Sequence, residues 1–263
     1  MTHRVLLLGG VDPCGGAGIT ADALVVAAHG AWPLPIAVVL TAQNRHRFDQ
    51  RFEVPVLQWR AALAAALADG EVHAVKTGLL GGAAAITEVA AALRPIAARV
   101  PIVVDPVLSA TAGGLLASTE EALAYKNCLL PLAALATPNL PEAEALFGGD
   151  PKKAFATGCR AVLCKGGHGG GEFVDDVLSQ PASELHFRRA RLEVGPVHGT
   201  GCALASAIAA RLALGIELEQ ACALAGDWLH ALLRELGPAR SDALPRPLPL
   251  GRPLPLPRAN AVT

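Results

Sequence analysis

The sequence predicts an α/β protein in which helices cover both faces of a central, mostly parallel sheet. Short apolar runs of strand length alternate along the 263 residues with longer, alanine-rich segments of helical length. Strands that are apolar throughout are typical of parallel sheets buried on both faces, and the helical segments are long enough to be the crossovers that parallel strands need. We therefore expect ligands to bind at the carboxyl ends of the strands.

The expected strands are six apolar runs, each followed within a few residues by Gly, Pro or Asn. They lie at residues 5–8, 36–40, 72–76, 102–105, 134–137 and 161–165. Two further β-like pieces, 172–178 and 185–192, are separated by Ser179-Gln180-Pro181 and are expected to form a hairpin that extends the sheet.

The expected helices are rich in Ala and Leu, which are strong helix formers. They lie at residues 17–29, 56–69, 83–98, 119–126, 141–147, 202–213 and 217–235. These elements predict a single domain over residues 1–237. After Gly237, prolines recur among leucines and arginines, which favours extended conformations over a helix. We expect residues 238–263 to form a Pro-rich tail that is disordered or extended, with docking to another protein as the alternative.

Composition excludes several classes of partner. The formal net charge of −1 gives no electrostatic footprint for nucleic acid or for an anionic membrane, so a small molecule is the expected partner. The six cysteines have neither CxxC spacing nor the density of a disulfide scaffold, and we expect reduced thiols in the cytoplasm. The apolar run 5–8 is too short for a signal-peptide core, and no stretch is long and apolar enough to span a bilayer.

A glycine turn before the helix expected at 202–213 is the most informative feature for function. Gly199, Thr200 and Gly201 can direct backbone N–H groups at one point near the positive end of the helix, which suits a phosphate. Cys202 lies at that end, where its thiol pKa is expected to fall, so that it could accept a proton from a substrate hydroxyl. The alternative is an ordinary glycine turn beside a small buried cysteine.

Other polar residues also follow the expected strands. The first strand ends in the loop GGVDPCGGAG, which is neither a dinucleotide fingerprint nor a GxxxxGK[ST] phosphate loop, and Asp22 follows it. The amide of Gln43 can offer a donor and an acceptor together, as an aminopyrimidine edge requires. Asp22 could equally face solvent, and Gln43 could be an ordinary turn residue.

Carboxylates follow the fourth and fifth strands, and a lysine ends the sixth. Asp105 and Glu142 are suitable ligands for Mg²⁺, directly or through water, although Asn139 and Glu142 could instead cap a helix. Lys165 stands before two glycines, where it could reach phosphates or simply remain hydrated.

Seven segments, in order over roughly the first 215 residues, together resemble the hydroxymethylpyrimidine kinase/phosphomethylpyrimidine kinase family of thiamine biosynthesis, within the ribokinase-like superfamily. They are GGVDPCGGAGITAD, LTAQN, VKTGLLG, VVDPVLSATAGGLL, ATPNLPEAEAL, VLCKGGH and HGTGCALASAIAARLALG. The resemblance implies a three-layer α/β/α sandwich, usually a homodimer. It implies ATP-dependent phosphorylation, with Mg²⁺, of 4-amino-5-hydroxymethyl-2-methylpyrimidine and then of its monophosphate.

The resemblance also implies roles for single residues. The positions that match the family's pyrimidine pocket are Gly10, Asp22, Gln43, Leu79 and Val107. Asp105 and the motif from Asn139 to Glu142 match the superfamily's magnesium and phosphate elements, and Lys165 with Thr200 matches its nucleotide side. The turn Gly199-Thr200-Gly201-Cys202 is similar to the family's anion hole, with Cys202 in the place of the aspartate base of ribokinase-like sugar kinases.

The chain also departs from the family pattern. A segment of helical length is missing within 147–160, the loop Arg45-His46-Arg47-Phe48 is more basic than expected, and Leu79 replaces a common methionine. Two other functions stay open: a pyridoxal kinase of vitamin B6 salvage, and a catalytically silent protein that senses a thiamine precursor. Retention of Asp105, Glu142, Lys165 and Cys202 argues against the silent sensor, which would not need a phosphotransfer set.

Overall fold

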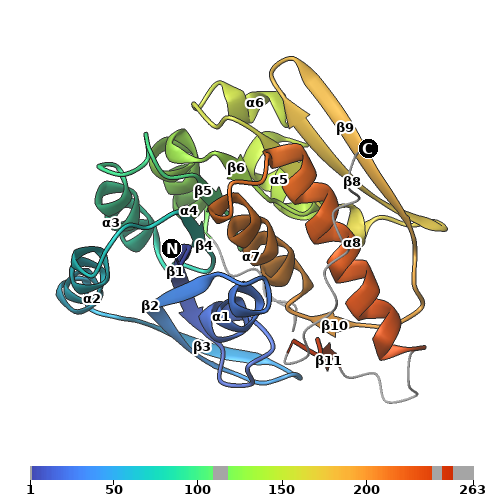
Figure 1. Cartoon of the computed structure of the whole chain (residues 1–263), viewed down its shortest axis with the longest axis horizontal. Helices are drawn as coiled ribbons and strands as arrows, with labels where there is room; N and C mark the ends of the chain where they lie inside the picture. The colour runs from blue at the N-terminus through green and yellow to red at the C-terminus, as the bar shows by residue number, and fades with distance from the viewer. Residues whose placement is uncertain (1, 109–117, 239–244, 251–263) are drawn as a thin grey trace.

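The computed structural model of the chain describes residues 2–108, 118–238 and 245–250. Within this part of the chain, nine strands form one sheet in the order β3-β2-β1-β4-β5-β6-β7-β8-β9 (Figure 1). The strands are β1 (Arg4–Val11), β2 (Trp32–Gln43), β3 (Phe48–Glu53), β4 (Ala74–Thr77), β5 (Ile102–Val104), β6 (Leu135–Ala136), β7 (Val162–Cys164), β8 (Phe173–Gln180) and β9 (Ser183–Ala190).

The six strands from β2 to β7 in this order run parallel, whereas β3, β8 and β9 join by antiparallel pairing at the two sides. The helices are α1 (Gly18–Ala28), α2 (Val56–Ala68), α3 (Ala83–Leu93), α4 (Thr119–Ala124), α5 (Leu140–Phe147), α6 (Lys152–Phe155), α7 (Thr200–Ala213) and α8 (Leu218–Leu236). A π-helical turn (Tyr125–Leu129) and 3₁₀ turns (Leu130–Leu132, Gly166–His168) complete the helical parts. The mostly parallel sheet between helices confirms the predicted fold class.

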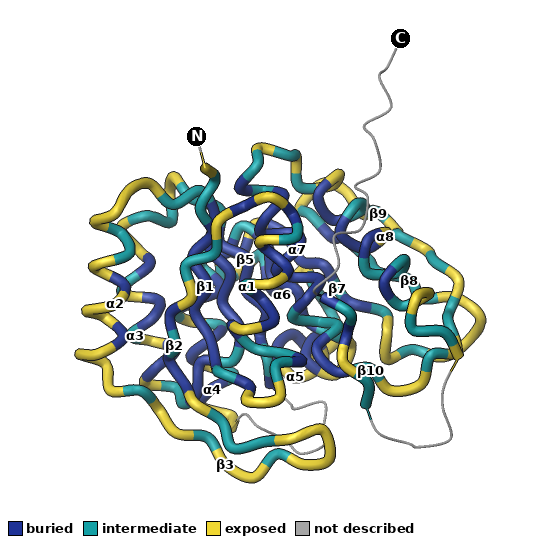
Figure 2. Tube along the Cα trace, turned by 60° about the horizontal axis from the view of Figure 1, so that its bottom comes forward, coloured by how far each residue is buried: buried dark blue, intermediate teal, exposed yellow. Residues whose placement is uncertain are grey.

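Strand β1 contributes side chains to two hydrophobic cores, one on each face of the sheet. Val5 and Leu7 belong to the apolar cluster under α1, α7 and α8, whereas Leu6 and Leu8 belong to the cluster under α2, α3 and α5. All four are fully buried, because successive side chains of a strand point to opposite faces and both faces of this strand are covered. Most of β1 has the colour of buried residues in Figure 2. Burying one such leucine contributes about 1.5–3 kcal/mol, so both helical layers are held to the same strand.

Three parts of the structure differ from the expected elements: the end of α3, the strand β3 and the helix α6. Helix α3 ends at Leu93 rather than at residue 98, because Pro95 has no N–H with which to continue the helical hydrogen bonds, although Arg94 keeps a helical conformation. Strand β3 was not expected, since four of the six residues in its sequence FDQRFE are polar, and it extends the sheet beyond the basic loop 45–47. The short segment 147–160 does contain a helix, α6, of only four residues.

Part of the Pro-rich tail packs on the domain. Strand β11 (Arg246–Pro247) pairs in parallel with β10 (Val197–His198), and Leu248 and Leu250 join the cluster under α7 and α8. Arg246 donates to the carbonyl oxygens of Leu236 (2.8 Å) and Gly237 (2.9 Å). Residues 245–250 therefore pack on the domain through Leu248 and Leu250. Apart from Pro238, the remainder of the expected tail lies outside the described residues. In the described parts of the chain, no helix combines the length and apolarity needed to cross a membrane.

Candidate active site

One cavity of about 550 Å³ opens at the carboxyl ends of the parallel strands. Its wall contains every site residue that the sequence predicted: Gly10, Asp22, Gln43, Leu79, Val107, Asp105, Asn139, Glu142, Lys165, Gly199, Thr200, Gly201 and Cys202. They come from segments nearly 200 residues apart. The sheet topology brings them together because parallel strands end at the same edge.

One side of this cavity is formed by glycine backbone and apolar side chains, together with the side-chain amide of Gln43. Gly10 lies against Leu79, and a Cβ at Gly10 would be 3.4 Å from Leu79 Cδ2, a distance of ordinary van der Waals contact. Val107 follows β5, and its N–H donates to the carbonyl oxygen of Asp105. Gln43, at the end of β2, adds a donor and an acceptor to this wall.

Asp22 lies beneath the cavity and is held by two buried partners. Lys76 Nζ on β4 donates to Asp22 Oδ2 (2.7 Å), and Ser206 Oγ on α7 donates to Asp22 Oδ1 (2.8 Å). Burial raises the pKa of Asp22 despite Lys76, whereas the nearby carboxylate raises the pKa of Lys76 against the opposing effect of burial. The alternative that Asp22 merely faces solvent is therefore wrong, since only 1% of the residue is exposed.

Lys165 and Asp105 form the second buried ion pair of the cavity. Lys165 Nζ donates to Asp105 Oδ1 (2.7 Å), which also accepts a 3.3 Å bond from Thr137 Oγ1. Burial opposes ionisation of Asp105, but Lys165 and then Lys76 outweigh it and lower its pKa. Lys165 is thus directed at the carboxylate, and the alternative of a hydrated surface lysine is wrong.

Asn139 and Glu142 form a capping box at the start of α5. Asn139 Oδ1 accepts from the N–H of Glu142 (2.9 Å), and Glu142 Oε2 accepts from the N–H of Asn139 (2.8 Å). The capping alternative is thus confirmed, yet both residues also line the cavity. Burial raises the pKa of Glu142, and its second oxygen, Oε1, accepts a long 3.4 Å bond from Leu108 N.

The glycine turn forms the N-terminus of α7, as the sequence predicted. Gly199 has φ 81°, and a Cβ there would lie 1.8 Å from the carbonyl oxygen of Gly16, so only glycine fits. Helix α7 begins at Thr200, two residues earlier than expected. Its first N–H groups have no partner within the helix and are available to an anion in the cavity.

Cys202 does not have the lowered thiol pKa that its place at the helix start predicted. Burial raises the pKa of Cys202 to about 12, and Asp105 and Asp22 oppose ionisation further, although Lys76 and Lys165 favour it. The expectation considered only the helix end and missed the burial of the thiol and the carboxylates of Asp22 on α1 and Asp105 after β5. In the free protein at neutral pH, Cys202 therefore keeps its proton.

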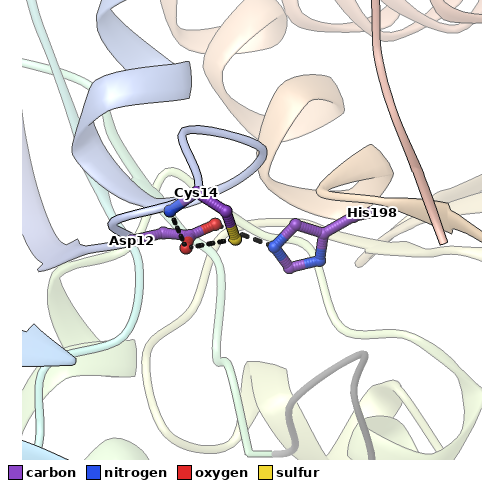
Figure 3. Close-up of side chains that lie close together, drawn as sticks. All are labelled: Asp12, Cys14 and His198. Carbon is purple, nitrogen blue, oxygen red and sulfur yellow. Dashed lines mark hydrogen bonds and ion pairs between the residues drawn. The ribbon is translucent and has the colours of Figure 1, made fainter. Parts of the chain in front are cut away.

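A second glycine loop, residues 12–17, lies against this turn (Figure 3). Asp12 is buried and accepts four hydrogen bonds: from Cys14 N (3.0 Å), Cys14 Sγ (2.8 Å), Ala17 N (3.0 Å) and His198 Nε2 (2.8 Å). Burial opposes ionisation of Asp12, but these donors, His198 first, lower its pKa to about 2. Because Asp12 is ionised at neutral pH, His198 Nε2 must be the donor of the bond that they share.

Sequence reasoning assigned no role to Lys76, Asp12 or His198. A signal for Lys76 was present, since a lysine in a strand expected to be buried on both faces needs an anionic partner. Asp12 and His198 are 186 residues apart, so no local pattern could have paired them.

Comparisons with known proteins agree with this geometry. A family model described as phosphomethylpyrimidine kinase matches residues 12–243. The chain is 36% identical over 244 residues to a hydroxymethylpyrimidine/phosphomethylpyrimidine kinase of Rhizobium meliloti (strain 1021), covering 89% of this chain and 91% of that protein. The structure resembles a phosphomethylpyrimidine kinase from Clostridium difficile 630 (TM-score 0.76, 29% identity, 87% and 98% covered). It also resembles an ADP complex of Bacillus subtilis pyridoxal kinase (TM-score 0.83, 28% identity, 93% and 96% covered).

Proposed function

The chain belongs to the phosphomethylpyrimidine kinase family, and we propose that it phosphorylates 4-amino-5-hydroxymethyl-2-methylpyrimidine and then its monophosphate, with ATP as donor, in thiamine biosynthesis. The observation that carries this proposal is the union, in one cavity, of an amide-bearing apolar wall with an anion-binding helix start. A homodimer, as the resemblance implies, is part of the proposal.

The pyrimidine is proposed to lie between Gly10, Leu79 and Val107, with the amide of Gln43 at its ring edge. Ring nitrogens and an exocyclic amine present an acceptor and a donor side by side, which one carboxamide can match. Asp22 has both oxygens engaged by Lys76 and Ser206, so it can contact the substrate only through a remaining lone pair. Its larger effect is to fix the floor of this pocket.

The γ-phosphoryl group is proposed to meet the N–H groups at the start of α7, with Lys165 alongside. A Cβ at Gly201 would lie 3.0 Å from Lys165 Nζ, so the ammonium group lies directly beside the turn. Phosphoryl transfer depends mainly on positioning and on neutralising charge. Thr200 and Asn139 complete the nucleotide side.

Cys202 is the proposed acceptor of the hydroxyl proton. As the substrate oxygen bonds to the γ-phosphorus, the bond from that phosphorus to ADP breaks and the hydroxyl proton passes to the sulfur, so the thiol must first be ionised. Its raised pKa makes this form scarce in the free protein, while Lys76 and Lys165 are the two charges that favour it. Proton removal is therefore the pH-sensitive step, whereas positioning persists without it.

The residues present fit a magnesium ion that arrives with ATP. Asp105 and Glu142 offer carboxylate oxygens at the phosphate side, and among the described residues the hydrogen bond to Glu142 Oε1 is a single long one, from Leu108 N. Mg²⁺ is usually held by one or two carboxylates together with phosphates and water. When bound, the ion neutralises charge on the transferred group.

Pyridoxal kinase activity is the second candidate, because the structural match to the Bacillus subtilis pyridoxal kinase covers 93% of the chain. Both substrates carry a hydroxymethyl group on an aromatic nitrogen ring. The proposal is tested by measuring ADP release from MgATP with each acceptor in turn. Release that depends on the pyrimidine supports it, and the absence of such release rejects it.

A further inference from the structure

We propose that Asp12 and His198 form a clasp that positions the anion-binding turn relative to the pyrimidine pocket, and that phosphoryl transfer depends on this clasp. The inference rests on the proposed function. Asp12 follows β1, which carries Gly10, and His198 directly precedes Gly199. Their side chains join at 2.8 Å and thereby connect the two loops that hold the two substrates.

The acceptor capacity of Asp12 is filled by the protein's own groups. The side-chain donors Cys14 Sγ and His198 Nε2 lie with Asp12 close enough together to serve as metal ligands. Each carboxylate oxygen, however, already accepts two hydrogen bonds, which is about its full capacity. Asp12 in Figure 3 therefore connects two loops and has little remaining capacity to bind a metal ion.

Close packing leaves the two loops little freedom once the clasp is formed. A Cβ at Gly16 would lie 2.5 Å from His198 Cδ2, and a Cβ at Gly199 would lie 1.8 Å from the carbonyl oxygen of Gly16. The backbone of each loop thus rests on the other. Without the clasp, the buried carboxylate would lose a charge-assisted bond and the imidazole would lose its partner, so the turn would gain other positions.

Neither residue touches the reacting atoms in this scheme, so both are positioning residues. Misplacement of reacting groups by about 1 Å can cost roughly 100-fold in rate. We therefore expect the clasp to affect kcat, since the transition state needs both loops in register. Pyrimidine binding depends chiefly on the wall around Gly10 and should change little.

The test compares three variants of the full chain: Asp12→Asn, His198→Leu and His198→Gln. We expect His198→Leu and Asp12→Asn to lower kcat by about 30-fold or more, with the KM for the pyrimidine within about threefold of the parent value. His198→Gln should recover most of the loss, since its amide can still donate to Asp12. The double variant Asp12→Asn/His198→Leu should be no worse than the poorer single variant.

A second His–Asp pair provides the control. His186 and Asp175 are 2.9 Å apart on the exposed β8–β9 hairpin, away from both loops. His186→Leu and Asp175→Asn should change kcat by less than about twofold, in keeping with the small effect of exposed pairs. Additive losses at Asp12 and His198, or a loss confined to KM, would overturn the proposal.

A readout without catalysis separates this proposal from the proposed function. Amide hydrogen exchange of residues 199–202 should be faster in His198→Leu than in the parent, and near the parent rate in His198→Gln. Unchanged exchange in His198→Leu would reject the clasp even if the kinase activity is confirmed. Should Asp12→Asn fail to fold, the two His198 variants decide the question by themselves.

Discussion

Lys165 Nζ lies 2.7 Å from Asp105 Oδ1, so the cation expected at the nucleotide is bound to the carboxylate expected at the metal. The two residues follow β7 and β5, which are separated in the sheet by β6 alone. In the free protein each neutralises the other. Binding of MgATP would offer the lysine a phosphate and the carboxylate a cation, so the pair is suited to exchange partners.

Replacing Lys165 by Met should therefore impair the use of ATP. We expect the KM for ATP to rise about tenfold or more, because a charge-assisted bond contributes about 1.5–3 kcal/mol, while pyrimidine affinity stays near the parent value. Steady-state kinetics with each substrate varied in turn, supported by calorimetry for the pyrimidine, provide the measurement. Equal weakening of both substrates would show that the lysine maintains the fold of the whole cavity instead.

Lys76→Met should lower the free energy of unfolding by about 3–5 kcal/mol, because it leaves the Asp22 carboxylate buried without its cation. Lys76→Met combined with Asp22→Asn should recover part of that loss. Urea unfolding curves of the three variants provide the measurement. Arg60→Met, which breaks an exposed pair with Glu88, is the control and should cost less than about 1 kcal/mol. A similar small loss in Lys76→Met would contradict the assignment of a buried pair.

The pH dependence of the reaction should report on Cys202. Since burial raises the thiol pKa to about 12, the ionised fraction grows about tenfold for each pH unit below that value. We expect kcat/KM to rise with pH from about 7 to 10 in the parent chain, and to be much lower and flat over this range in Cys202→Ala. Cys128→Ala, away from the cavity, is the matched control. A pH profile of the same shape in parent and Cys202→Ala would remove the cysteine from proton transfer.

Gln43→Ala should weaken pyrimidine binding about 10-fold or more, because the amide is proposed to read two ring-edge groups at once. The effect should be the same on kcat/KM and on affinity, since the contact exists before and during transfer. Calorimetry with the unphosphorylated pyrimidine measures it directly. Unchanged affinity would exclude Gln43 from recognition and direct attention to the backbone around Val107.

Leu248→Ala should destabilise the domain by about 2–4 kcal/mol, because this tail residue is buried in the cluster under α7 and α8. Leu57→Ala is the control: Leu57 is 85% exposed, so its loss should change stability by less than about 0.5 kcal/mol. Chemical unfolding monitored by fluorescence gives both values. Equal stability of the two variants would show that the tail does not contribute to the core.

Much of this architecture could be predicted from hydrophobic pattern and turn chemistry. Each of the six expected parallel strands is present, with its ends within a few residues of the expected ones. Short, continuous apolar runs bounded by turn residues are typical of buried strands. Strand β3 could not be found in this way, since four of its six side chains are polar and its place is set by pairing with β2. The docking of residues 245–250 likewise depends on β10, about 50 residues away.

The residues proposed from the sequence line one cavity, but the electrostatics of that cavity could not be predicted from the sequence. Strand ends and glycine turns place Asp105, Lys165 and Cys202 by local rules, and the topology brings them together. The thiol pKa of Cys202 depends instead on burial first and then on charged groups, among them Asp105 and Asp22, that approach only through tertiary packing. The partners of Lys76 and Asp12 could not be predicted from the sequence either, because they too come close only in the folded chain.

The most direct test of the proposed function is mass spectrometry of the products formed from MgATP with an equal mixture of hydroxymethylpyrimidine and pyridoxal. If the proposed function is correct, we expect the pyrimidine monophosphate first and then its diphosphate, with little pyridoxal phosphate. Pyridoxal phosphate alone would contradict it and would assign the protein to vitamin B6 salvage.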